Sequence, residues 1–385
     1  MILARAPLGM HWPTLDPFLF CAHHDDHYPK GDGRFGPAAS LQGRQMGSDF
    51  SALNGWSMYH GQQVPGFPAH PHRGFETVTL VRTGRIDHSD SLGAAARFGG
   101  GDVQWLTAGS GIVHAEMFPL LREDAENPLE LFQIWLNLPA RSKMCKPYFS
   151  MLWAENVPRG RFGAEGGPMT EVVVVAGQIA GLTPLAPPPD SWASQADADV
   201  GIFTLKLDPG AEFTLPPAAG AQTLRVAYFF AGDALTAAGQ AVAEPSALQV
   251  DASQPLPLTN PGKQPAELLV LQGRPIGEPV ARHGPFVMNT EAEIRTAFAD
   301  YQRTRFGGWP WPRRRCTART RRALPASRTA RRSGEAKSTA VHASRRPLVA
   351  GSAHSSRPRL FCRGASIPSV AIRRARAGAQ FPDLE

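Results

Sequence analysis

The chain has 385 residues, of which 42% are hydrophobic, and it contains 38 glycines and 36 prolines. That length suits two ordinary domains with hydrophobic cores, and so many turn-forming residues favour short strands over long helices. The composition therefore excludes a coiled coil, a helical bundle and a collagen-like fibre.

The formal net charge of +7 is distributed unevenly along the chain. Residues 313–385 carry 18 of the 40 basic side chains but only 3 of the 33 acidic ones. Residues 1–312 therefore hold 22 basic and 30 acidic side chains, a net charge of −8. Because this body is acidic, we expect no specific binding of nucleic acid by its folded part.

The four cysteines form no CxxC pair, which is neither a disulfide framework nor a zinc motif. The first residues contain no apolar run of signal-peptide length, and no stretch has the 18 or so apolar residues of a membrane span. We expect a cytoplasmic protein without a membrane segment.

Short strands separated by turns are predicted from about residue 56 onward. The first block has β-branched and apolar runs at 75–81, 103–107 and 131–137. Such closely spaced strands are typical of a sandwich or a small barrel. We therefore expect a first domain over 1–140, followed by a linker at 141–165.

A second strand-rich block follows, and we place a second domain at 166–312. Its clearest predicted strands lie at 172–175, 202–207, 223–230 and 266–271. A closing helix is predicted over 290–303, because Thr290 can cap it and acidic residues occupy its first turn.

The character of the sequence changes after the run GGWPWP, which ends at Pro312. Residues 313–385 are rich in Arg, Ala, Pro and Ser and lack hydrophobic periodicity, so we expect a disordered basic tail. Two origins stay open: a frameshift or misassigned stop near Arg313, or a genuine basic extension.

A metal site is predicted by the residues His70, His72, His114 and Glu116. On a strand, side chains two residues apart point the same way, so His70 and His72 can address one point. His114 and Glu116 can do the same from a second strand, and spacing alone leaves Glu76 as a competing carboxylate. Three imidazoles and one carboxylate suit Fe(II), Mn, Ni, Cu, Co or Zn.

The run HPHRGFETVTLVRTGRIDHSDSLGAAARFGGGDVQWLTAGSGIVHAEMFP, which begins at His70, resembles the signature of the pirin family within the cupin superfamily. The resemblance continues through LELFQIWLNLPARSK and returns in the run from Gly284 to Pro312. It implies an all-β fold of two stacked cupin barrels, a bicupin, with metal in the N-terminal barrel only.

The resemblance also implies a ligand set and an activity. It assigns His70, His72, His114 and Glu116 as the ligands of a mononuclear metal, usually Fe(II), and leaves Glu76 as a non-ligand. It implies cleavage of a flavonol such as quercetin, or a related aromatic enol, by dioxygen with release of carbon monoxide. Glu116 would then be the catalytic proton acceptor.

A second function stays open from the same resemblance. The protein could be a transcriptional co-regulator, in which iron senses redox state or metal and a surface recruits a protein partner. The ligands would be the same under both hypotheses.

Three further motifs have structural interpretations. We expect residues 23–27, with three histidines and two aspartates, to form a polar loop rather than a second metal site. Residues 87–90 are predicted to form a turn at the barrel rim, with a proton-relay role for His88 as the alternative. Arg73 is expected to pair with a carboxylate.

Overall fold

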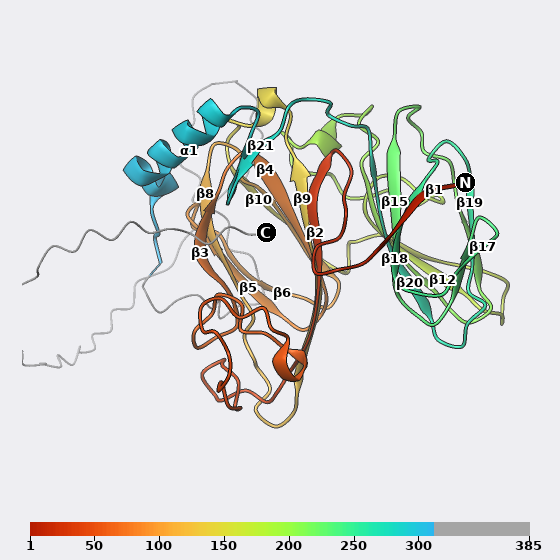
Figure 1. Ribbon diagram of the computed structural model, residues 1–385, viewed down its shortest axis with the longest axis horizontal. Coiled ribbons are helices and arrows are strands. Elements are labelled where there is room, and N and C mark those ends of the chain that lie inside the picture. Colours follow the sequence, from red (N-terminus) through yellow and green to blue (C-terminus); the bar gives the residue numbers. More distant parts are fainter. Residues whose placement is uncertain (312–385) are drawn as a thin grey trace, which may run out of the picture. The chain divides into compact units, whose positions relative to one another are not determined.

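The computed structural model describes residues 1–311, and the basic tail predicted at 313–385 lies outside these residues. Figure 1 shows two groups of β-strands, with α1 (Glu291–Thr304) next to the hairpin of β21 (Ala281–His283) and β22 (Phe286–Met288). The predicted all-β architecture of two cupin barrels and one C-terminal helix is confirmed.

The first barrel is built from two antiparallel sheets. A five-stranded sheet has the order β10-β7-β4-β9-β2, and a four-stranded sheet has the order β3-β8-β5-β6. Their strands are β2 (Phe18–Tyr28), β3 (Gly66–His72), β4 (Phe75–Thr83), β5 (Ile86–Asp90), β6 (Ala95–Phe98), β7 (Asp102–Thr107), β8 (Ile112–Met117), β9 (Asn127–Asn137) and β10 (Tyr148–Leu152).

The second barrel combines a seven-stranded sheet, β1-β18-β15-β20-β13-β12-β11, with a four-stranded sheet, β14-β19-β16-β17. Its strands are β1 (Ile2–Pro7), β11 (Arg159–Phe162), β12 (Thr170–Ala176), β13 (Gly201–Leu207), β14 (Glu212–Leu215), β15 (Leu224–Ala231), β16 (Leu235–Ala237), β17 (Gln240–Val242), β18 (Ser246–Val250), β19 (Leu256–Thr259) and β20 (Ala266–Gly273).

A hairpin and a helix complete the described chain. The hairpin pairs β21 (Ala281–His283) with β22 (Phe286–Met288), and α1 (Glu291–Thr304) follows. Thr290 caps α1 through a capping box with Glu293, as its predicted start requires. Short 3₁₀ turns are η1 (Leu53–Gly55), η2 (Ala140–Ser142), η3 (Trp192–Ser194) and η4 (Arg305–Gly307). Within residues 1–311, no helix has the length and apolar character needed to cross a membrane.

The strand pairing differs from the predicted domain boundaries at both ends of the first domain. β1 pairs with β18, so the first residues belong to a sheet of the second barrel. The expected linker at 141–165 contains β10, which pairs with β7, and β11, which pairs with β12. These strands escaped prediction because β1 carries no apolar alternation and the 141–165 segment is rich in polar residues and turns.

Two polar segments that were expected to be a loop and a turn are strands. Residues 23–27 lie within β2, whose register pairs His23 with Phe132 on β9. Residues 87–90 lie within β5 and are buried. Burial of β5 is tolerated because Asp87 binds the guanidinium of Arg97 at 2.6 and 2.7 Å, and His88 binds Asp90 at 3.0 Å.

The apolar faces of both barrels share one hydrophobic core. This core contains Val78, Leu80 and Phe132 from the first barrel together with Val226 and Leu269 from the second. A separate core fills the second barrel and consists of apolar side chains such as Phe203 and Leu268. The core of the second barrel is therefore largely apolar, whereas the first barrel buries polar side chains such as His88 and Glu116.

Lys143 joins the first barrel to β22 from a fully buried position. Its ammonium group donates to Asn137 Oδ1 at 2.7 Å, to Gly74 O at 2.9 Å and to Val287 O at 3.2 Å. Burial lowers the pKa of this amine to about 8. Among residues 1–311 no carboxylate forms an ion pair with it, and three carbonyl oxygens satisfy its three donors.

Lys143→Ala should therefore destabilise the protein strongly. The change leaves three buried acceptors without donors, and we expect it to lower the free energy of unfolding by about 2–4 kcal/mol. Urea denaturation at pH 7 measures the effect. Lys146→Ala removes an exposed lysine nearby and is the control, and equal stability of the two variants would contradict the assignment.

Candidate metal centre

Three histidines converge in the interior of the first barrel. The register of β3 and β8 places His70 opposite His114, while His72 lies two residues further along β3. One ring nitrogen from each lies within 4.8 Å of the other two. The predicted convergence of His70, His72 and His114 is thus present, and within residues 1–311 this is the only group of three or more such ligand atoms.

The ring nitrogens that meet are the Nε2 atoms. His70 Nε2 lies 3.0 Å from His72 Nε2 and 3.0 Å from His114 Nε2. For an ion about 2.1 Å from each nitrogen, this separation corresponds to a nitrogen–metal–nitrogen angle of roughly 90°. That angle suits an octahedral ion better than a tetrahedral one, which would need about 3.4 Å between nitrogens.

Backbone carbonyls fix the tautomers of two of these rings. His70 Nδ1 lies 2.8 Å from Pro68 O, and His72 Nδ1 lies 3.3 Å from Pro285 O. A carbonyl only accepts hydrogen bonds, so each Nδ1 carries the proton and each Nε2 presents a lone pair. Two lone pairs facing each other at 3.0 Å repel unless a cation lies between them, and this arrangement fits a bound metal.

Burial keeps the three imidazoles neutral at physiological pH. It lowers the pKa of His70 to about 4 and holds the pKa values of His72 and His114 well below 6.5. The neighbouring imidazoles act in the same direction on His72 and His114. Neutral imidazole is the form that binds metals, so protons do not compete for these nitrogens near pH 7.

Glu116 is buried in the same barrel but lies outside the cluster of ring nitrogens. Its Oε1 lies 3.0 Å from the Thr79 hydroxyl, and its Oε2 accepts from Gln133 Nε2 at 3.3 Å. Burial raises its pKa, and His88 and these two hydrogen bonds partly offset the rise. The structure therefore holds the Glu116 carboxylate through Gln133 and Thr79, a residue that the sequence analysis did not identify, and does not bring it into the histidine cluster.

Glu76, the competing carboxylate, is fully buried and has other partners. Thr107 Oγ1 donates to its Oε1 at 2.6 Å, and Ser191 Oγ donates to its Oε2 at 2.5 Å. Both carboxylate oxygens are thus satisfied away from the histidine cluster. Burial raises the pKa of Glu76 to about 7, with these hydrogen bonds opposing the rise.

A second buried group lies against the histidine cluster. The His88 ring is 5.6 Å from the His114 ring and stacks on Phe149 at 4.7 Å. Its Nε2 lies 3.0 Å from Asp90 Oδ2, and its Nδ1 lies 3.1 Å from Gln104 Nε2. These residues belong to the segment 87–90, whose polar side chains led the sequence analysis to predict a turn instead of a buried strand.

The histidines and aspartates of residues 23–27 do not gather into a second site. His23 binds Glu130 at 3.1 Å, His24 binds the Tyr59 hydroxyl at 2.8 Å, and Asp26 accepts from the same hydroxyl at 2.8 Å. Alternation along β2 sends neighbouring side chains to opposite faces.

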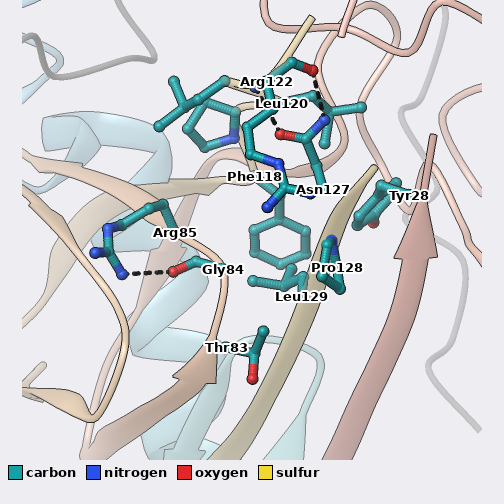
Figure 2. Close-up of a pocket in the computed structure, with 12 residues that line it drawn as sticks. Tyr28, Thr83, Gly84, Arg85, Phe118, Leu120, Arg122, Asn127, Pro128 and Leu129 are labelled. Atoms are coloured by element: carbon teal, nitrogen blue, oxygen red, sulfur yellow. Dashed lines mark hydrogen bonds between the residues drawn. The ribbon is translucent and has the colours of Figure 1, made fainter. Parts of the chain in front are cut away.

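A pocket lies beyond the end of β8, and Figure 2 shows the residues that line it. Its volume is about 290 Å³. Phe118, Leu120 and Leu129 contribute apolar walls, and the Arg85 guanidinium binds the Gly84 carbonyl at 2.9 Å. None of the three clustered histidines lines this pocket, so it is separate from the candidate metal centre.

The fold and the histidine cluster define a bicupin with a candidate metal centre in its first barrel. Family models for pirin and for the pirin C-terminal cupin domain match residues 34–136 and 202–307. The chain belongs to the pirin family.

Relatives of known name support the same grouping. Pirin-1 of Arabidopsis thaliana is 38% identical over 254 residues, covering 63% of this chain and 78% of the relative. A Pseudomonas aeruginosa protein, provisionally named a quercetin 2,3-dioxygenase, is 34% identical over 245 residues, covering 64% and 80%. A crystal structure described as quercetin 2,3-dioxygenase from Acinetobacter baumannii has a TM-score of 0.62 at 24% identity, covering 80% of this chain and 98% of that one, and shows the shared fold.

His114→Ala should abolish stoichiometric metal binding, because it removes one of three converging nitrogens. We expect wild-type protein to retain about one ion per chain after gel filtration, measured by elemental analysis. His27→Ala alters an exposed histidine and is the control. Unchanged metal content in His114→Ala would contradict the assignment.

Glu76→Gln should change how stability depends on pH. Folded Glu76 keeps its proton up to about pH 7, whereas its ordinary pKa is 4.5, so the wild type loses stability as pH rises between these values. Glutamine cannot ionise, and the stability of the variant relative to wild type should rise by about 2–3 kcal/mol from pH 4.5 to 8. Urea unfolding at both pH values tests this, and a pH-independent difference would contradict it.

Proposed function

We propose that this pirin is a mononuclear metal-dependent dioxygenase that cleaves a flavonol such as quercetin, or a related aromatic enol. His70, His72 and His114 would bind the metal, with Glu116 as the fourth ligand or as a base beside it. Fe(II) is the ion that we favour. The observation that carries this proposal is the convergence of three imidazoles, two of them buried, with the buried carboxylate of Glu116 two residues beyond His114 on β8.

Two further observations support an oxidative reaction at this site. Three nitrogen donors and one carboxylate leave open positions on an octahedral ion, which a substrate oxygen and dioxygen could use. The names of the Pseudomonas relative and of the Acinetobacter neighbour assign quercetin 2,3-dioxygenase activity to those proteins. The metal, when bound, would act as a Lewis acid and supply the electron transfer that allows an enol to react with dioxygen.

The chain's own residues would accept the proton of the substrate hydroxyl and orient the substrate. Glu116 would accept the proton of the substrate hydroxyl, and its raised pKa makes it a stronger base than an exposed glutamate. Thr79 and Gln133 would hold the carboxylate in place and stabilise its charged form.

Aromatic side chains beside the histidines suit a flat aromatic substrate. Phe67, which is partly exposed, lies 6.4 Å from the His70 ring and stacks on Tyr59 at 5.2 Å. Trp135 lies 5.5 Å from the His72 ring. These rings would exclude water and hold the plane of a flavonol by stacking.

Oxygen uptake tests the proposal. The full chain is loaded anaerobically with Fe(II), quercetin is added, and oxygen consumption and carbon monoxide release are measured. We expect both in wild-type protein, and we expect Glu116→Gln to lower kcat about 100-fold while retaining iron. Glu126→Gln neutralises an exposed acid and is the control.

The alternative outcome is equally informative. If fully iron-loaded protein consumes no oxygen with quercetin or other flavonols, the dioxygenase proposal is wrong. The regulatory hypothesis would then be favoured, and the search would be for a protein partner that distinguishes the two oxidation states of iron.

A further inference from the structure

Residues 281–311, here called the C-terminal arm, reach back to the first barrel and contact a proposed metal ligand. Pro285 O lies 3.3 Å from His72 Nδ1 and 3.4 Å from the Arg73 amide nitrogen. The partner that fixes the tautomer of His72 therefore comes from a segment 213 residues away in sequence. His70, in contrast, has its carbonyl partner Pro68 on its own strand.

The backbone of the arm is seated tightly on the residues that follow His72. Val287 N donates to Arg73 O at 3.0 Å. Gly74 has φ +86°, and a Cβ atom there would lie 1.9 Å from Val287 O, so only glycine allows this approach. Lys143 adds donors to both Gly74 O and Val287 O.

The helix of the arm is held by the side chain of Arg73. One guanidinium nitrogen binds Asp300 on α1 at 3.0 Å, and Nε donates to Ser110 O at 2.8 Å. The guanidinium also lies 4.5 Å above the Phe306 ring. A single buried arginine, next to His72 in sequence, thus joins α1 and η4 to the loop before β8.

The end of the arm contacts the strands that carry and flank His114. Gly111 lies just before β8 begins and packs against the Phe306 ring. A Cβ atom on Gly111 would lie only 2.6 Å from that ring, so there is no room for a larger residue. Trp311 Nε1 donates to Asp90 O at 2.8 Å, and Asp90 is the register partner of His114. The arm therefore contacts the surroundings of two of the three clustered histidines.

We propose that the C-terminal arm is a positioning element of the metal centre, so that metal binding and docking of the arm strengthen each other. This inference rests on the metal site of the proposed function. A docked arm holds the Nδ1 proton of His72 and orients its ring, which favours metal binding. Because linkage is reciprocal, a bound metal must favour the docked arm by the same factor.

Metal affinity of arm variants is the first test, with Co(II) as the probe and a chelator competing for it. Asp300→Asn weakens the contact with Arg73 without loss of volume, and Phe306→Ala loosens η4. Both residues lie outside the ligand set, yet we expect each variant to bind Co(II) about tenfold more weakly and to change the visible spectrum of the bound ion.

Glu291→Gln is the matched control, because it removes the same charge from an exposed position on the same helix. We expect its affinity for Co(II) to stay within about twofold of wild type. Circular dichroism of the metal-free variants verifies that each is folded.

Hydrogen exchange of the full chain is the second test. We expect amides of residues 291–304 to exchange several-fold more slowly when Co(II) is bound. Wild-type affinity in both arm variants, together with exchange in α1 that is insensitive to Co(II), would overturn the positioning role. Absence of Co(II) binding by wild-type protein would instead overturn the metal site itself.

Discussion

The register between β3 and β8 is the constraint on which the candidate site depends. It places His70 opposite His114, and the two-residue repeat of a strand then brings His72 to the same point. A slip of one residue would turn each of these side chains to the other face of the sheet. The hydrophobic residues of the surrounding strands hold this register, so the chemistry of the site is a consequence of how the barrel packs.

Buried polar groups in the interior of the first barrel partner one another. His88 lies between Asp90 and Gln104, and Glu116 contacts Thr79 and Gln133. Burying such groups is costly unless each finds a partner. The second barrel also buries partnered polar groups, since Arg225 Nε donates to Gln272 Oε1 at 2.9 Å.

The sequence predicted the strands at 75–81 and 131–137 and the start of α1, because hydrophobic periodicity and a capping box are local signals. It also predicted which three histidines meet, since two HxH-like pairs on adjacent strands need only the period of a strand. It failed for β2 and β5, whose polar residues indicated loops. Their burial depends on partners such as Arg97 and Tyr59. These partners lie elsewhere in the chain, so the sequence of β2 and β5 alone does not indicate them.

The contacts of the C-terminal arm could not be predicted for the same reason. Arg73 was expected to pair with a carboxylate and does so, but nothing local indicates that the carboxylate is Asp300. Pro285 contributes a backbone carbonyl, which any residue could supply. Long-range backbone contacts of this kind are set by the assembled fold.

The pairing of β1 with the second barrel has a consequence for how the protein folds and for how it can be cut into fragments. β1 covers the edge of the second barrel at β18, although it is synthesised before either barrel. A fragment that begins after residue 140 would expose that edge, with unpaired backbone groups ready to add a strand from another molecule. β1 must therefore stay unpaired until β18 has been made, and expression of the second barrel without β1 would favour aggregation.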